Sequence, residues 1–270
     1  MIEPKPCGSF LEIDGHGYVI KKASFDLIQS AWTPLVNDVV QAYKEFFGSN
    51  LHSIWLRGSV AKGQAEDGVA DLDSFGYVME ARHSLDQFDQ TILDLEPLYP
   101  FCTGIEWGAD PIARLAKDRV MARIIKTQAV CLYGEDVSHS IPPHSFRDMI
   151  HYSKYLRCNI EEKMPTFLKE NDGNPRKIRH TCTWTARALL RSLFETIMFD
   201  EMRWTNDLWL CYERYSSRYP EQESDTMELL QLCLNPTEDE VRLRVAVSAF
   251  TPWIYEDIRD RLGIESDGRY

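Results

Sequence analysis

The spacing of apolar residues divides the chain into two parts. In the first part, short apolar runs that fit buried strands alternate with stretches of helical period. Strands are expected at residues 51–56, 71–78, 102–107 and 129–133, and helices at 24–48 and 84–95, after a short hairpin at 10–21. This alternation indicates an α/β or α+β domain, which we expect to be built on a mixed sheet.

The second part is helical almost throughout. Residues 136–143 have no periodic pattern and end in Ile-Pro-Pro, which is typical of a linker. After them, helical spacing covers residues 145–168, 175–193, 207–215, 225–234 and 237–262. We therefore expect a first domain over residues 1–140, which includes the N-terminal hairpin and helix, and an all-α helical bundle over 141–270.

Composition narrows the function classes. The 270 residues include 42 acidic and 30 basic side chains, a net charge of -12. Nucleic acid and anionic membranes attract clustered Lys and Arg, so neither is expected as a partner. The seven cysteines form no Cys-x-x-Cys pair, which argues against a disulfide framework or a zinc site. Without a signal-like start or a long apolar run, the chain is expected to be cytoplasmic.

The segment with the clearest chemistry lies where the first strand ends. Gly58 and Ser59 follow that strand and open a short helix, so a phosphate can approach the glycine backbone and bind the serine hydroxyl. Asp71 and Asp73 are two residues apart on the next expected strand and therefore share one face. Such paired carboxylates suit Mg²⁺, which bridges carboxylates to substrate phosphates.

A third carboxylate is expected because nucleotidyl transfer commonly uses two metal ions. Glu106 is the best candidate, since it is flanked by apolar residues on an expected strand, and it would act as metal ligand and general base. Asp110 is the alternative, although Asp110-Pro111 is more typical of a helix N-cap. Lys62 follows Ser59 by about one helical turn and can reach a phosphate, but a solvated lysine is the commoner interpretation.

These residues resemble those of the DNA polymerase β-like nucleotidyltransferase superfamily. The resemblance rests on Gly58-Ser59, the following Asp71-x-Asp73, and Glu106 between Ile and Trp, and it covers roughly residues 50–135. The order of domains is similar to that of the aminoglycoside adenylyltransferases of the streptomycin and spectinomycin type. One departure is Ser74, because the residue after the second aspartate is usually apolar in the superfamily.

The resemblance implies a role for each candidate. Gly58 and Ser59 would hold a triphosphate, and Asp71 and Asp73 would bind Mg²⁺, with two ions expected. In the second part, Arg187 and Arg203 lie in segments similar to the family's nucleotide-contacting helix and the turn after it. Either arginine can instead pair with nearby carboxylates on the surface.

The expected function is therefore a Mg²⁺-dependent nucleotidyltransferase. It would move a nucleoside monophosphate, AMP from ATP in the first instance, onto a hydroxyl of a small molecule such as an aminoglycoside-like antibiotic. Two alternatives stay open. One is an adenylyltransferase that modifies a protein, and the other is a regulator that binds nucleotide without catalysis.

Overall fold

The computed structural model of the chain describes residues 2–6, 8–82, 84–150, 164, 166, 168–169, 174–250 and 254, and in it the apolar runs of the first part form one mixed sheet. The strands are β1 (Leu51–Arg57), β2 (Leu72–Val78), β3 (Ile105–Glu106), β4 (Ala109–Pro111) and β5 (Val130–Gly134). Their order is β3-β2-β1-β5, and β4 also pairs with β2. β1 runs antiparallel to β2 and β5, whereas β3 and β4 run parallel to β2, so the mixed sheet is confirmed.

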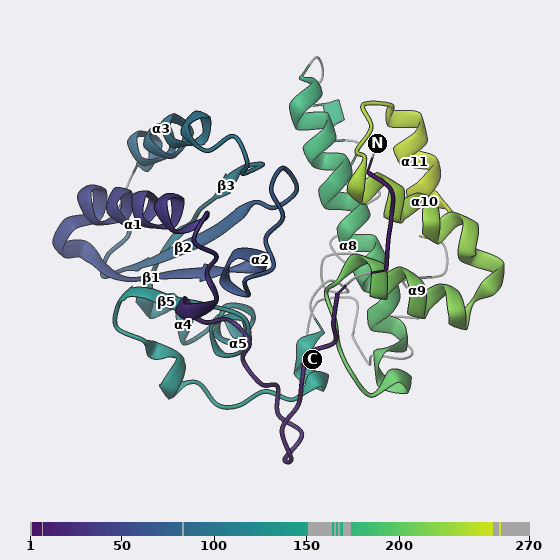
Figure 1. Cartoon of the computed structure of the whole chain (residues 1–270), viewed down its shortest axis with the longest axis horizontal. Helices are drawn as coiled ribbons and strands as arrows, with labels where there is room; N and C mark the ends of the chain where they lie inside the picture. Colours follow the sequence, from purple (N-terminus) through teal and green to yellow (C-terminus); the bar gives the residue numbers. More distant parts are fainter. Residues whose placement is uncertain are drawn as a thin grey trace. The chain divides into compact units, whose positions relative to one another are not determined.

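Helices cover both faces of this sheet (Figure 1). On one face, α1 (Thr33–Phe47) and α3 (Asp86–Leu95) share a core with alternate strand residues, including Ile54 and Leu56. On the other face, α5 (Arg119–Thr127) packs around the intervening residues of the strands, including Trp55. Because successive strand residues point to opposite faces, the first part forms a three-layer α/β arrangement.

The helix expected over residues 24–48 begins only at Thr33. Ser24 does act as an N-cap, but of a three-residue 3-10 turn, η1 (Phe25–Leu27). Pro34 occupies the first turn of α1, where its missing N–H and fixed φ are tolerated. The expectation of a helix start at Ser24 is therefore wrong, and the proline was the signal for the true start.

The strand expected over residues 102–107 is shorter than its apolar pattern suggests. After β3, the chain pairs with β2 a second time as β4. Asp110 lies inside β4 and does not cap α4 (Ile112–Leu115), which has no side-chain cap. The expected N-cap role of Asp110 is therefore wrong, because parallel pairing with β2 holds the residue in extended backbone.

The chain clusters into two compact units, Ile13–Ser145 with the sheet, and Met1–Glu12 together with Phe146–Tyr270. The described elements of the second unit are helical, with η5 (Phe146–Met149) followed by α8 (Pro175–Glu201), α9 (Leu208–Arg218), α10 (Glu223–Leu234) and α11 (Glu240–Ser248). Most of the helix expected at 145–168, and the end of the one at 237–262, fall outside the described residues. An apolar face of α8, which includes Leu189 and Leu193, is fully buried.

The first twelve residues group with this helical unit, whereas the sequence placed them in the first domain. The backbone N–H of Leu11 donates to the carbonyl of Trp204 at 2.9 Å, and the hydroxyl of Thr205 donates to the carbonyl of Ser9 at 3.0 Å. The ring centre of Phe10 lies 6.2 Å from the ring centre of Phe194 on α8. These contacts join positions far apart in the chain, which local periodicity does not reveal.

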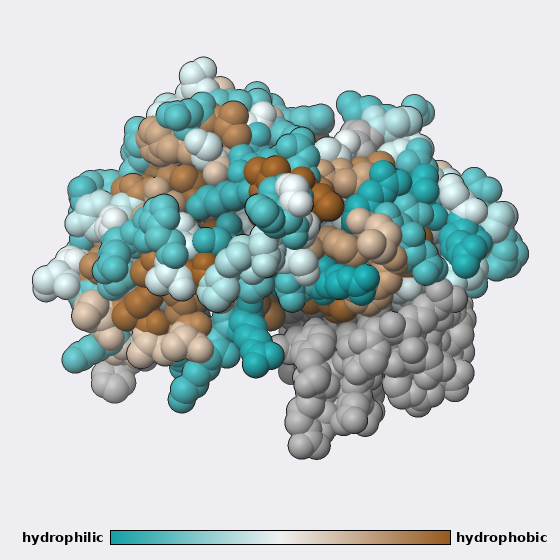
Figure 2. Space-filling view, turned by 90° about the horizontal axis from the view of Figure 1, so that it is seen from below, coloured by the Kyte–Doolittle hydropathy of each residue, from teal (hydrophilic) through white to brown (hydrophobic). Residues whose placement is uncertain are grey.

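The surface carries apolar side chains in separate places. Leu98 in the first unit is 66% exposed and Val241 in the second is 70% exposed. Figure 2 shows apolar residues on one face of the molecule interspersed with hydrophilic ones. Among the helices that the structure describes, none has both the length and the apolar character needed to cross a membrane.

Candidate active site

The turn after β1 brings backbone and carboxylate into close contact. β1 ends at Arg57, and the short helix α2 (Gly58–Ala61) starts at once. Gly58 has a φ of +81°, and a Cβ built on it would lie 2.6 Å from Oδ2 of Asp73. Only glycine meets both conditions without strain. The carbonyl of Ser59 accepts a hydrogen bond from the N–H of Gln64 at 2.9 Å, which closes the turn. Ser59 is half-buried.

Strand pairing places three charged residues at matched positions. Arg57 of β1 is the register partner of Asp73 of β2, and Asp73 is the register partner of Glu106 of β3. Paired positions on neighbouring strands project from the same face of a sheet. Ile105, the neighbour of Glu106, packs in the core with α1, so the three side chains project from the opposite face.

The guanidinium of Arg57 lies between the two carboxylates. Its Nη2 is 2.7 Å from Oδ1 of Asp73 and 3.7 Å from Oε2 of Glu106. The Asp73 side chain is 15% exposed, whereas those of Arg57 and Glu106 are 38% and 54% exposed. We call Asp73 and Glu106 the carboxylate row. The row is open to solvent on the Glu106 side, where a substrate can approach.

Asp71 directly precedes β2 and is half-buried. It lies close enough to Cys102 to help raise the pKa of that thiol, although burial of the thiol is the main cause. Asp71 thus lies beside the strand that carries Asp73. The bonding of Asp71 to a metal ion remains a prediction from its spacing.

The oxygen donors of the carboxylate row suit a hard divalent cation. Among the described residues, no group of three or more His, Cys, Asp or Glu side chains is arranged to hold a metal ion. However, Nη2 of Arg57 shows that two carboxylates can share one positive group at this position. Carboxylate oxygens are the ligands that Mg²⁺ prefers, so these two side chains fit the ion in chemistry.

A buried hydrogen-bond network holds the backbone behind Glu106. The hydroxyl of Ser74 donates to the carbonyl of Glu106 at 3.1 Å and lies 3.3 Å from the hydroxyl of Tyr43 on α1. The Tyr43 hydroxyl donates to the carbonyl of Gly108 at 3.0 Å. Burial raises the pKa of Tyr43 to about 12, so the hydroxyl keeps its proton at neutral pH.

This network explains the departure at Ser74. An apolar side chain there would leave the carbonyl of Glu106 without this donor. Sequence reasoning missed Tyr43, although a serine inside an apolar strand signals a buried polar partner. Ser74 and Tyr43 thus fix the backbone at Glu106 and at Gly108, just after β3.

The remaining candidates lie apart from the carboxylate row in the chain. Lys62 is the C-cap of α2, and its N–H donates to the carbonyl of Ser59 at 3.1 Å. Arg187 lies on α8, half-buried, and its Nε has no hydrogen-bond partner among the residues that the structure describes. Their contacts with a nucleotide stay predictions.

Arg203 belongs to a charged cluster of the helical unit. Its guanidinium stacks 3.8 Å from the ring centre of Phe10, and its Nη2 lies 3.1 Å from a carboxylate oxygen of Glu201. Arg214 donates two hydrogen bonds of 3.0 Å to the same carboxylate. Burial raises the pKa of Glu201, but hydrogen bonds from Arg214 and Arg203 outweigh it, so the pKa lies below its usual value. Arg203 thus has a structural role within the helical unit.

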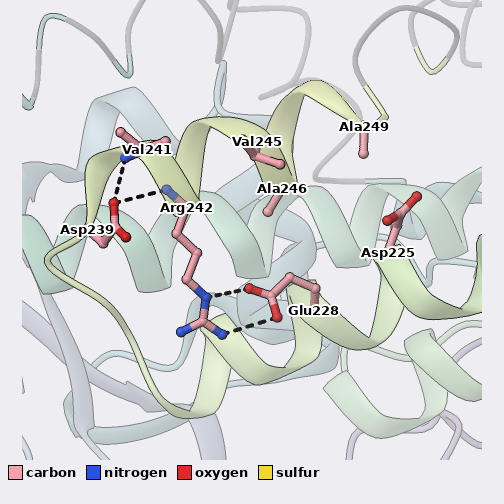
Figure 3. Close-up of a pocket in the computed structure, with 8 residues that line it drawn as sticks. All are labelled: Asp225, Glu228, Asp239, Val241, Arg242, Val245, Ala246 and Ala249. Atoms are coloured by element: carbon pink, nitrogen blue, oxygen red, sulfur yellow. Dashed lines mark hydrogen bonds and ion pairs between the residues drawn. The ribbon is translucent and has the colours of Figure 1, made fainter.

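A groove of about 420 Å³ lies between α10 and α11 in the helical unit (Figure 3). Its lining is acidic and apolar, and Arg242 binds Glu228 through two hydrogen bonds of 2.6 and 3.1 Å. The groove contains none of the predicted site residues. It therefore does not extend the site that the sequence predicts.

Comparison with known proteins supports the fold. The chain is similar to a solved structure of spectinomycin adenyltransferase AAD(9) from Enterococcus faecialis with ATP and spectinomycin, at a TM-score of 0.51 and 12% identity. The match covers 82% of this chain and 98% of that one. No family model and no curated protein matches the sequence. The predicted resemblance to aminoglycoside adenylyltransferases is thus confirmed at the level of fold.

Proposed function

We propose that this chain is a nucleotidyltransferase that moves AMP from ATP onto a hydroxyl of a small molecule, an aminoglycoside-like compound in the first instance. The observation that carries the proposal is the register of Asp73 with Glu106, next to the turn at Gly58. It gathers two carboxylates and a close-approach backbone at one end of the sheet. The similarity to the fold of AAD(9), which was solved with ATP and spectinomycin, supports the choice of substrates.

Each predicted residue has a role in this proposal. The backbone of Gly58 and Ser59, together with the Ser59 hydroxyl, binds the triphosphate. Asp71, Asp73 and Glu106 provide oxygen ligands for Mg²⁺, with two ions proposed, and bound Mg²⁺ supplies charge neutralisation at the triphosphate. Lys62, Arg187 and Arg203 are proposed to contact the phosphates.

Glu106 is proposed as the general base. Its side chain is 54% exposed at the open side of the carboxylate row, where an acceptor hydroxyl can reach it. The hydroxyl gives its proton to Glu106, and its oxygen forms a bond to the α-phosphorus. The bond between the α-phosphorus and the bridging oxygen breaks, and pyrophosphate leaves with the electron pair.

Pyrophosphate release from Mg·ATP, measured over a panel of aminoglycosides and spectinomycin, tests the proposal. E106Q and D73N are expected to reduce the rate by at least about 100-fold, since E106Q removes the proposed general base and D73N removes a proposed metal ligand. D94N is the matched control, because Asp94 lies on α3, accepts a hydrogen bond from Gln90 and is outside the carboxylate row.

Three results contradict the proposal in different ways. Equal rates for D73N and the unchanged chain would remove the assigned role of Asp73. Labelled AMP on protein instead of on the small molecules would identify a protein-directed enzyme. Tight Mg·ATP binding without pyrophosphate release over the whole panel would identify a non-catalytic regulator.

A further inference from the structure

The position of Arg57 has a consequence for cation binding. A single nitrogen, Nη2, contacts Oδ1 of Asp73 at 2.7 Å and lies 3.7 Å from Oε2 of Glu106. Mg²⁺ binds carboxylate oxygens at about 2.0–2.1 Å. A cation shared by these two oxygens would therefore need the space that Nη2 fills, and its positive charge would repel the guanidinium.

We propose that Arg57 is an internal counter-ion of the carboxylate row, which a divalent cation must displace in order to bind. The inference rests on the proposed function for the identity of the row as a metal site. Arg57 holds Asp73 and Glu106 together while no metal is present, and its ion pair competes with the metal for the same oxygens.

The surroundings of Arg57 allow the displacement. Its side chain is 38% exposed, so the guanidinium can move into solvent without breaking the core. Its backbone ends β1 directly before the turn at Gly58. The displaced guanidinium consequently stays beside the backbone proposed to hold phosphate, and it can pair with an anion that arrives together with the cation.

This arrangement couples two binding events. A cation alone must displace Arg57 and leave it without an anionic partner. A cation that arrives with a triphosphate gives Arg57 a new partner. We therefore expect weak binding of the metal alone, and stronger binding of the metal–nucleotide complex than of either component.

Mn²⁺ titration of the full chain without nucleotide, followed by the electron paramagnetic resonance signal of free Mn²⁺, tests the competition. R57Q is expected to bind Mn²⁺ about two- to fivefold more tightly than the unchanged chain, because an ion pair of this exposure opposes the metal by roughly that factor. R57M is the second variant if R57Q does not fold, as checked by circular dichroism.

R114Q is the matched control for net charge. Arg114 also pairs with an aspartate, Asp110, but both side chains are largely exposed and neither belongs to the carboxylate row. Its removal changes the net charge by the same amount as R57Q. Mn²⁺ affinity of R114Q is expected to stay close to that of the unchanged chain.

The inference is overturned if R57Q and R57M bind Mn²⁺ no more tightly than the unchanged chain, or if R114Q tightens binding equally. It is also overturned if none of these chains binds Mn²⁺. The titration needs no turnover, so it separates the two proposals. Tighter binding by R57Q without any nucleotidyl transfer would contradict the proposed function alone, and transfer without tighter binding would contradict the role of Arg57 alone.

Discussion

The substitution G58A measures how closely the turn after β1 and the carboxylate row depend on each other. Gly58 has a φ of +81°, and an added Cβ would lie 2.6 Å from Oδ2 of Asp73. The left-handed conformation alone costs a non-glycine residue about 1–2 kcal/mol. The added carbon would also push the end of the Asp73 side chain away from Arg57, and the loss of that ion pair adds up to about 1 kcal/mol. We expect G58A to lower the free energy of unfolding by the sum of these two effects.

Gly17 provides a matched control for the conformational part. Its φ is +84°, close to that of Gly58, but an added Cβ would meet no atom within 4 Å. Both glycines belong to the unit Ile13–Ser145. G17A should therefore show the conformational cost of about 1–2 kcal/mol without the collision.

Equilibrium unfolding in urea, followed by tryptophan fluorescence, measures both variants. The same measurement on D73A and on G58A/D73A completes a double-mutant cycle. Without the Asp73 carboxylate, the cost of G58A should fall to that of G17A. Equal costs for G58A and G17A in the unchanged background would refute the contact between the turn and Asp73.

Three further predictions concern residues that support the site or the helical unit. Burial raises the pKa of Tyr43 from 10.0 to about 12, so folding favours the protonated hydroxyl. The resulting stabilisation of the fold amounts to about 3 kcal/mol. It is fully present below pH 10 and is lost as the pH rises towards 12. Y43F should therefore lose less stability than the unchanged chain between pH 9 and pH 11, as followed by urea midpoints, and parallel losses would contradict the shift. S74A removes the hydrogen bond to the carbonyl of Glu106, so we expect the free energy of unfolding to fall by about 1–2 kcal/mol. We also expect a lower kcat at unchanged KM for ATP. A change in KM alone would contradict a positioning role. R203M should lower the free energy of unfolding by about 1 kcal/mol, because Arg203 stacks on Phe10. Unchanged stability together with weaker ATP binding would instead identify Arg203 as a nucleotide contact only.

The sheet and its motif were predictable because their signals are local. The strands β1, β2 and β5 form where apolar runs are bounded by polar or turn residues. β1 and β2 have residues buried on both faces, whereas β5 is half-buried to exposed. Asp71 and Asp73 were recognisable from a spacing of two, which is a property of any extended backbone. Glu106 was chosen by its apolar neighbours, and strand pairing makes it the register partner of Asp73.

The partners of these residues were not predictable, because they depend on strand pairing. Nothing in the local sequence relates Arg57 to Glu106, which join only through the register of three strands. The same holds for Tyr43, which reaches Ser74 from a helix 31 residues earlier. Local patterns determine which elements form, whereas distant pairing determines which side chains meet.

The charge of the chain illustrates the difference between composition and site. A net charge of -12 suggests a surplus of carboxylates available for a cation. In the folded chain, Arg57 of β1 instead places a positive group against the carboxylate row. Asp73 and Glu106 at paired positions would otherwise repel each other and weaken the pairing of β2 with β3. Arg57 offsets this repulsion through its ion pairs, and in our proposal the same contact opposes a metal ion. We therefore expect cation affinity at the proposed site to depend on one arginine more directly than on the acidic composition of the chain.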